Sequence, residues 1–147
     1  MIDLNKFYET LDKSGVKFFT GVPDSLLNDF CLYLNENLTK EKHLITANEG
    51  NAIAVAAGYY LSTGNLPLIY MQNSGIGNSV NPLISLTNKE TYSIPMILLI
   101  GWRGSPDEKD WAHHMKQGRE TPSILETLDI PWAILEDNDE DVEMLVK

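Results

Sequence analysis

The sequence predicts an α/β fold with an open, mostly parallel sheet and helices on both faces. Short apolar runs alternate with segments of helical periodicity along the chain. Strands that are joined through helices form right-handed crossovers in a parallel sheet. The runs at 67–72 and 94–101 are almost unbroken apolar, which is typical of strands covered on both faces.

Each element of this prediction rests on a local pattern. The first helix, 3–14, opens with a capping aspartate and stops at a glycine, and the second, 24–38, has leucines at helical spacing. The third helix is rich in alanine. The predicted strands are 17–21, 43–46, 67–72, 94–101 and 132–136, and the predicted helices are 3–14, 24–38, 49–62, 77–88, 121–128 and a last one in the acidic segment from 138.

Length and composition narrow the classes of function. The 147 residues suit a single domain, 1–147, and 43% hydrophobic with 22% charged residues is typical of a globular protein. The formal net charge of -10 disfavours binding to nucleic acids or to anionic membranes. Cys31 is the only cysteine, so we expect neither an intrachain disulfide nor a cysteine-based metal cluster. With no signal pattern at the N-terminus, we expect a cytoplasmic location.

The loops after the predicted strands are the expected place for a ligand, because parallel sheets bind ligands at the carboxyl ends of their strands. Each of these loops is polar or rich in glycine. They read Gly-Val-Pro-Asp-Ser at 21–25, Ala-Asn-Glu-Gly-Asn at 47–51, Asn-Ser-Gly-Ile-Gly-Asn at 73–78 and Trp-Arg-Gly-Ser at 102–105.

Glu49 opens a helix of small residues, and two interpretations are open for it. Asn48 can cap this helix, and the helix dipole favours a carboxylate in the first turn, so Glu49 can simply stabilise its own helix. In the functional interpretation, Glu49 is a partly buried carboxyl that points at a ring nitrogen. Gln72, Asn73, Ser74 and Gly75 offer amides and backbone N–H groups to the edge of a heterocycle, or form a turn that only caps the next helix.

Four segments together resemble the thiamine-diphosphate-dependent decarboxylases. Asn-Glu-Gly-Asn-Ala at 48–52, followed by Ala-Ala-Gly-Tyr at 56–59, is similar to the helix that carries the family's glutamate. The resemblance is greatest to phosphonopyruvate decarboxylase and to the alpha subunit of sulfopyruvate decarboxylase. The segments that carry it are Gly-Val-Pro-Asp-Ser-Leu-Leu at 21–27, Met-Gln-Asn-Ser-Gly-Ile-Gly-Asn at 71–78 and Lys-Gln-Gly-Arg at 116–119.

The resemblance implies that Glu49 hydrogen-bonds the aminopyrimidine ring of thiamine diphosphate and activates this cofactor, which then removes carbon dioxide from a 2-oxo acid. It implies that Gln72, Asn73, Ser74 and Gly75 bind the cofactor as well. Asp24 would face the substrate and assist proton transfer, although its simplest role is to cap a helix. Ser25 would bind the substrate, and His114 is a further catalytic candidate.

Residues 103–119 form a basic segment in an acidic protein. Such a segment can attract an anionic 2-oxo acid, or it can be a solvated loop that Asp107, Glu108 and Asp110 balance. The substrate-binding candidates here are Arg103, Lys109, His113 and His114. The corresponding family segment reads Asp-Glu-Pro-Gln-His, which Asp110 and His114 match and Trp111, Ala112 and His113 do not. We expect the two adjacent histidines to point apart, which argues against a metal site.

No Gly-Asp-Gly motif, the family's signature for holding the diphosphate through Mg²⁺, occurs in the sequence. The resemblance therefore implies a diphosphate-binding partner, either a beta subunit or another part of a longer enzyme, in an assembly that is at least a dimer. Two other classes of protein stay open, namely a non-catalytic α/β binding module and, more weakly, a flavodoxin-like flavin binder. A carboligase or acetolactate-type enzyme fits the motifs less well.

Overall fold

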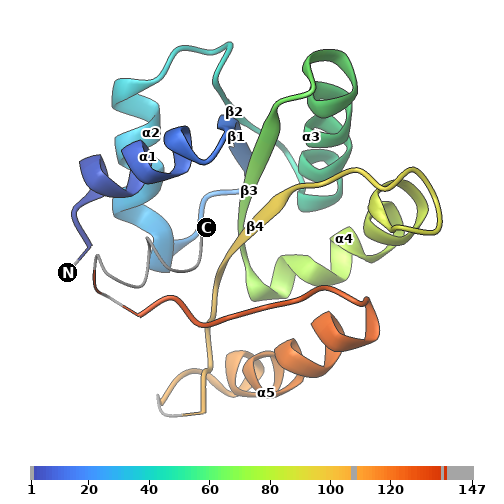
Figure 1. Ribbon diagram of the computed structural model, residues 1–147. Coiled ribbons are helices and arrows are strands. Elements are labelled where there is room, and N and C mark those ends of the chain that lie inside the picture. Colours follow the sequence, from blue (N-terminus) through green and yellow to red (C-terminus); the bar gives the residue numbers. More distant parts are fainter. Residues whose placement is uncertain (1, 107–108, 137, 139–147) are drawn as a thin grey trace.

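The computed structural model describes residues 2–106, 109–136 and 138 of the chain. These residues form a four-stranded, all-parallel sheet with strand order β2-β1-β3-β4 (Figure 1). The strands are β1 (Val16–Gly21), β2 (His43–Ile45), β3 (Leu66–Gln72) and β4 (Ile97–Gly101). The open parallel α/β fold predicted from the sequence is therefore confirmed.

Within the described residues, five α-helices connect and cover the strands. They are α1 (Leu4–Lys13), α2 (Asn28–Asn37), α3 (Glu49–Thr63), α4 (Ile76–Pro82) and α5 (Ala112–Thr127). Short 3₁₀ turns precede α2 and α4, at Ser25–Leu27 and Asn73–Gly75, and a π-helical turn, Leu83–Thr87, follows α4. Asp3 caps α1 through its side chain, as the sequence predicts, and Gly64 ends α3 in the left-handed conformation.

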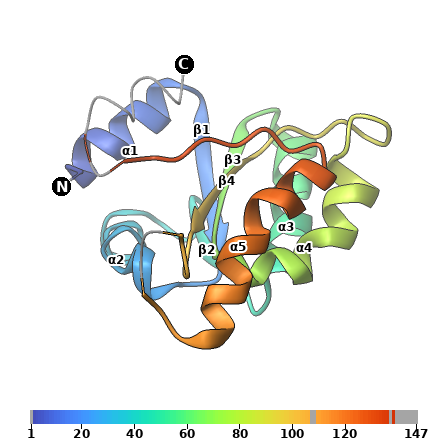
Figure 2. The ribbon, with the colours of Figure 1, turned by 90° about the horizontal axis from the view of Figure 1, so that it is seen from below.

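The sheet separates two hydrophobic cores. Side chains alternate along β3, so Leu68 and Tyr70 pack against α1 and α2, whereas Ile69 and Met71 pack against α3, α4 and the end of α5. Figure 2 shows α1 and α2 on one side of the sheet and α3, α4 and α5 on the other. Burial on both faces explains why the β3 sequence is almost continuously apolar.

The predicted helix boundaries differ from those of the structure in three places. The segment 24–38 is divided between a 3₁₀ turn and α2, and the segment 77–88 between α4 and a π-helical turn. Helix α5 begins at Ala112, nine residues before the predicted start. Gly118 and Pro122 lie inside α5. Because both residue types usually mark helix ends, the sequence pattern did not predict the first turns of this helix.

The predicted strand at 132–136 is wrong, because this segment has no regular secondary structure. Two of its apolar residues, Trp132 and Leu135, contact other parts of the chain instead of pairing with a strand. Trp132 lies edge-on against Trp102, with 6.5 Å between the ring centroids, and Leu135 packs against the core under α1 and α2. The predicted helix in the acidic segment lies almost wholly outside the described residues. Across the part of the chain that the structure describes, no helix is long and apolar enough to cross a membrane.

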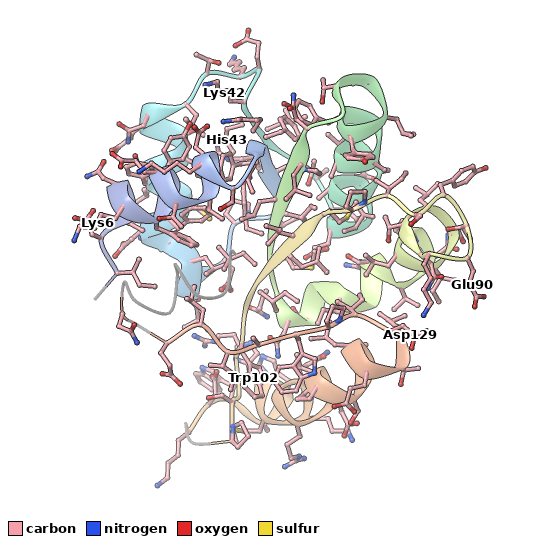
Figure 3. All side chains as sticks on the ribbon, in the orientation of Figure 1. Lys6, Lys42, His43, Glu90, Trp102 and Asp129 are labelled. Atoms are coloured by element: carbon pink, nitrogen blue, oxygen red, sulfur yellow. The ribbon has the colours of Figure 1, made fainter. Side chains whose placement is uncertain are left out.

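A buried polar pair links β2 to β3. The Nε2 atom of His43 lies 2.8 Å from the hydroxyl oxygen of Tyr70, and both side chains are buried (His43 is labelled in Figure 3). Burial lowers the pKa of His43, because desolvation penalises the imidazolium form. The folded protein therefore holds His43 neutral at pH values where the unfolded chain binds a proton.

We expect this pair to make stability dependent on pH. The contribution of His43 is complete above the ordinary histidine pKa of about 6.5 and decreases as the pH falls through it toward the lower pKa of the folded state. Urea unfolding at about pH 7.5 and about pH 5.5 should show a decrease in the free energy of unfolding, with a slope of at most roughly 1.4 kcal/mol per pH unit between the two pKa values. His43→Gln, which can still bond Tyr70, should reduce this loss, and an unchanged loss would contradict the assignment.

Candidate active site

The carboxyl ends of the strands bring the predicted site loops together on one edge of the sheet. Gly21 of β1 is in register with Tyr70 of β3, and Gln72 of β3 is in register with Gly101 of β4. The N–H and hydroxyl of Thr46, after β2, both donate to the carbonyl oxygen of Gly21 at 2.9 and 3.1 Å. Helix α5 lies below this edge in Figure 1.

Glu49 is half-buried in the first turn of α3. The predicted cap is confirmed, because the side-chain oxygen of Asn48 accepts the Asn51 N–H at 3.2 Å. The Nδ2 group of Asn78, in α4, donates to Oε2 of Glu49 at 2.8 Å. The carboxyl is therefore held by a second helix and does more than stabilise its own.

Glycine makes room for the Glu49 side chain. A Cβ atom at Gly75 would lie 2.5 Å from Cγ and 2.6 Å from Cδ and Oε1 of Glu49. A Cβ atom at Gly50 would lie 2.7 Å from the Asn78 carbonyl oxygen, so the first turns of α3 and α4 are in close contact. Beside this contact, the exposed Ser74 hydroxyl accepts a 2.7 Å hydrogen bond from Nε2 of Gln72.

The Asn73 side chain is buried and joins three segments. Its Nδ2 group donates to the Arg103 carbonyl oxygen at 3.0 Å and to the Thr121 hydroxyl at 2.9 Å. Its Oδ1 atom accepts the Arg103 N–H at 3.3 Å. The end of β3, the loop after β4 and α5 are thereby fixed to one another. Both polar atoms of this side chain are engaged within the protein.

Asp24 is buried, and it caps the 3₁₀ turn after β1. Its Oδ2 atom accepts the Leu26 N–H at 3.0 Å, as predicted. The same oxygen lies 2.3 Å from the position that a Cβ atom at Gly101 would take, so the carboxyl lies directly over the end of β4. Ser25 is exposed beside it.

Arg103, Asp110 and His114 form a partly buried cluster between the end of β4 and the start of α5. The Nε atom of Arg103 lies 3.0 Å from Oδ2 of Asp110, and Nδ1 of His114 lies 2.9 Å from Oδ1. Hydrogen bonding from His114, together with the Trp111 N–H and the charge of Arg103, lowers the pKa of Asp110. The charge of Arg103 is thus balanced by Asp110, whereas Asp107 and Glu108 lie outside the described residues.

The other two basic candidates, Lys109 and His113, are exposed. The expectation that the adjacent histidines point apart is wrong, since the rings of His113 and His114 lie 4.2 Å apart in an edge-on arrangement. Neighbouring residues on a helix are separated by about 100° around its axis, which still lets suitable rotamers bring two rings together. Within the described ranges, no group of three or more His, Cys, Asp or Glu side chains is arranged to hold a metal ion.

The loop after β4 crosses α5 at two glycines. A Cβ atom at Gly118 would lie 1.7 Å from the Gly104 carbonyl oxygen, and one at Gly104 would lie 2.0 Å from the His114 carbonyl oxygen. Gly104 also has a positive φ of 68°. The Trp102 indole N–H donates to the Gly118 carbonyl oxygen at 2.8 Å (Trp102 is labelled in Figure 3). This crossing sets the position of the cluster around Asp110.

Sequence reasoning did not identify the residues that hold the candidates in place. Asn78 belongs to a motif segment, but nothing in the sequence indicates that it bonds a carboxyl 29 positions earlier. Thr121 and Gly118 were likewise not assigned a role. A contact between distant segments becomes visible only when the sheet brings their loops together.

A family model described as "Thiamine pyrophosphate enzyme, N-terminal TPP binding domain" matches residues 5–123. The chain is 37% identical over 130 residues to a phosphonopyruvate decarboxylase of Streptomyces viridochromogenes, a match covering 87% of this chain and 31% of that protein. It is 38% identical over 125 residues to the sulfopyruvate decarboxylase subunit alpha of Methanococcus maripaludis, covering 85% of this chain and 72% of that subunit.

The fold is also that of solved structures. Benzoylformate decarboxylase from Polynucleobacter necessarius superposes with a TM-score of 0.56 at 20% identity, over 71% of this chain and 18% of that one. The chain spans about a third of the length of the phosphonopyruvate decarboxylases that it matches.

Proposed function

Because this chain belongs to the thiamine pyrophosphate enzyme family, as its N-terminal TPP binding domain, we propose that it is the pyrimidine-binding half of a 2-oxo acid decarboxylase. The observation that carries the proposal is the half-buried carboxyl of Glu49, held by Asn78 and lying against Gly75. We propose phosphonopyruvate as the substrate, with phosphonoacetaldehyde and carbon dioxide as products, and sulfopyruvate as the alternative.

The surroundings of Glu49 fit one face of a flat heteroaromatic ring. Gly75 presents no side chain here, and a single added Cβ atom would collide with the carboxyl. Asn78 holds Oε2, which leaves Oε1 to exchange a proton with a ring nitrogen. Bound thiamine diphosphate would supply the electron sink for decarboxylation. Gln72, Ser74 and the backbone of Asn73 and Gly75 are the proposed contacts to the edge of the ring.

The other candidates surround the place where the 2-oxo acid would react. Asp24, buried over the end of β4, and His114, on the first turn of α5, are the proposed groups that move protons. Lys109 and His113 are the proposed cationic groups for the anionic head group, and Ser25 is a further proposed contact; all three are exposed. Arg103 contributes chiefly by holding Asp110.

The diphosphate and its Mg²⁺ are proposed to bind to a partner domain or subunit, in an assembly with at least two copies of this chain. The relatives named as subunit alpha support such a partner. So does the surface beside Glu49, because residues 50–88 contain no Asp, Glu, Lys, Arg or His in a chain with a net charge of -10. Within this stretch α3 exposes Ala54, Gly58 and Leu61, and the turn after α4 exposes Ile84.

We expect Ala54→Arg to weaken assembly with the partner without unfolding the chain. Ala54 is exposed in the middle of α3, so arginine adds no strain, but an interface would have to desolvate its charge. Co-purification with the diphosphate-binding half would measure the loss. Asn35→Arg, an exposed position on α2, is the control, and equal recovery of both variants would place the interface elsewhere.

The decisive experiment is a reconstitution. The chain is combined with a matching diphosphate-binding domain, thiamine diphosphate and Mg²⁺, and carbon dioxide release from phosphonopyruvate and from sulfopyruvate is assayed. Release from either substrate supports a decarboxylase, and the ratio of kcat/KM identifies the head group. An assembly that binds the cofactor but decarboxylates neither substrate would favour the non-catalytic binding module.

A further inference from the structure

Asp110 accepts hydrogen bonds from more groups than any other side chain around the site. Its Oδ1 atom accepts the Trp111 N–H at 2.7 Å and a hydrogen from Nη2 of Arg103 at 3.2 Å, and lies 2.9 Å from Nδ1 of His114. Its Oδ2 atom pairs with Nε of Arg103. The three side chains are only 13 to 24% exposed, so solvent screens these contacts less than it does at the open surface.

Local structure explains how the cluster forms. Asp110 precedes α5, and His114 follows four residues later, so the two side chains lie on the same face of the helix start. Arg103 comes from the loop after β4, whose path is fixed by Asn73 and by the crossing at Gly104 and Gly118. The carboxylate therefore meets the imidazole in a rigid frame.

This contact determines which nitrogen of His114 carries the proton. A carboxylate can only accept, so an unprotonated Nδ1 would place two lone pairs against each other at 2.9 Å. The Nε–H of Arg103 is also directed at Nδ1, but at 3.4 Å, and Nη2 lies 3.3 Å from it. The contact with Asp110, at 2.9 Å, is the shorter one and joins Nδ1 to a carboxylate, so it decides the tautomer. A further titratable neighbour is His113, whose ring is edge-on to that of His114. The neutral ring is then protonated at Nδ1, and Nε2 keeps its lone pair.

We propose that Asp110 is a positioning residue: it fixes His114 in the Nδ1–H tautomer and so presents Nε2 as the atom that moves a proton. The catalytic consequence rests on the function proposed above, whereas the tautomer is a property of this chain and can be measured without any partner. The depressed pKa of Asp110 agrees with the proposal, because it keeps the carboxyl ionised over the neutral pH range.

The first test is nitrogen NMR on the full chain with ¹⁵N-labelled histidine, at a pH of about 8, where histidine is neutral. His114 should show the proton on Nδ1. Asp110→Ala should shift it toward Nε2, and Asp110→Asn, whose amide oxygen can still accept, should retain more of the Nδ1–H form. Glu120→Ala removes a carboxylate from the same helix that pairs with Lys116, and should change nothing.

Two results would overturn the positioning role: a wild-type His114 protonated at Nε2, or an Asp110→Ala spectrum with the wild-type tautomer. If Asp110→Ala does not fold, as judged by circular dichroism, Asp110→Ser takes its place, because the hydroxyl can still accept the Trp111 N–H but is too short to reach the ring.

The second test uses the reconstituted decarboxylase. Asp110→Ala should lower kcat by about 10- to 100-fold, as expected for the loss of a group that orients a catalytic histidine, with little change in KM. A tautomer shift with unchanged kcat would overturn the catalytic consequence. If the wild-type assembly releases no carbon dioxide at all, the proposed function fails, and the NMR result still decides the role of Asp110.

Discussion

Replacing Glu49 with glutamine is expected to lower kcat of the reconstituted enzyme by about 100- to 10,000-fold, the range that a general acid–base group contributes. Glutamine keeps the length of the side chain and an oxygen that can accept the Asn78 Nδ2–H, so the contact between α3 and α4 should survive. The substitution removes the carboxyl group that is proposed to exchange a proton with the pyrimidine ring of the cofactor. Carbon dioxide release measures the effect, and thermal unfolding checks that the fold is intact.

Glu36→Gln is the matched control, because Glu36 is an exposed glutamate on α2, on the opposite face of the sheet. It removes the same charge at a distance from the site. Wild-type turnover by the Glu49→Gln enzyme would show that the carboxyl has only a structural role, in its own helix and in the contact with α4, and the decarboxylase mechanism would then have to be abandoned.

Gly75→Ala should cost about 100-fold in kcat, because displacing a catalytic group by about 1 Å has effects of this size. The added Cβ atom would lie 2.5 Å from Cγ of Glu49. A glutamate side chain is flexible, so it should move aside rather than unfold the protein. The expected result is therefore a large loss of turnover with a small loss of stability, which kinetics and urea unfolding measure separately.

The same turn of the chain provides the control. Gly77, two residues along in α4, has no atom within 4 Å of an added Cβ, and it is exposed. Gly77→Ala should leave kcat unchanged and stabilise the protein by up to about 1 kcal/mol, since alanine is the better helix former. An equal decrease in kcat for Gly75→Ala and Gly77→Ala would mean that turnover does not depend on the position of the Glu49 carboxyl.

Most of the helices and strands could be predicted from residue patterns within short segments. The almost continuous apolar runs predict β3 and β4 because both faces of the sheet are covered, and Asp3, Asn48 and Gly64 mark helix ends through their own hydrogen bonds or φ angles. The segment 132–136 was wrongly predicted to be a strand because it too is a short apolar run. Trp132 and Leu135 do pack, but against Trp102 and the core under α1, and periodicity cannot distinguish this from pairing in a sheet.

The sequence could predict which residues are candidates for the site, but not which contacts they make with one another. The loops at the strand ends could be selected because parallel sheets bind ligands there. Which partners these residues would have was not visible, because the bond from Asn78 to Glu49 spans 29 residues and that from Asn73 to Thr121 spans 48. In the sequence Asp110 is one of several acids that can balance a loop, and its contacts with Arg103 and His114 become visible only in the folded chain.

The crossing of Gly104 and Gly118 limits which residues near the Asp110 cluster can be varied if the proposed decarboxylase is to accept another substrate. Any side chain at either position would push the loop off the helix and displace the Asp110 cluster with it. Directed evolution toward another 2-oxo acid should therefore hold both glycines constant. Randomisation belongs at Lys109, Trp111 and His113, whose side chains face solvent and can be exchanged without repacking.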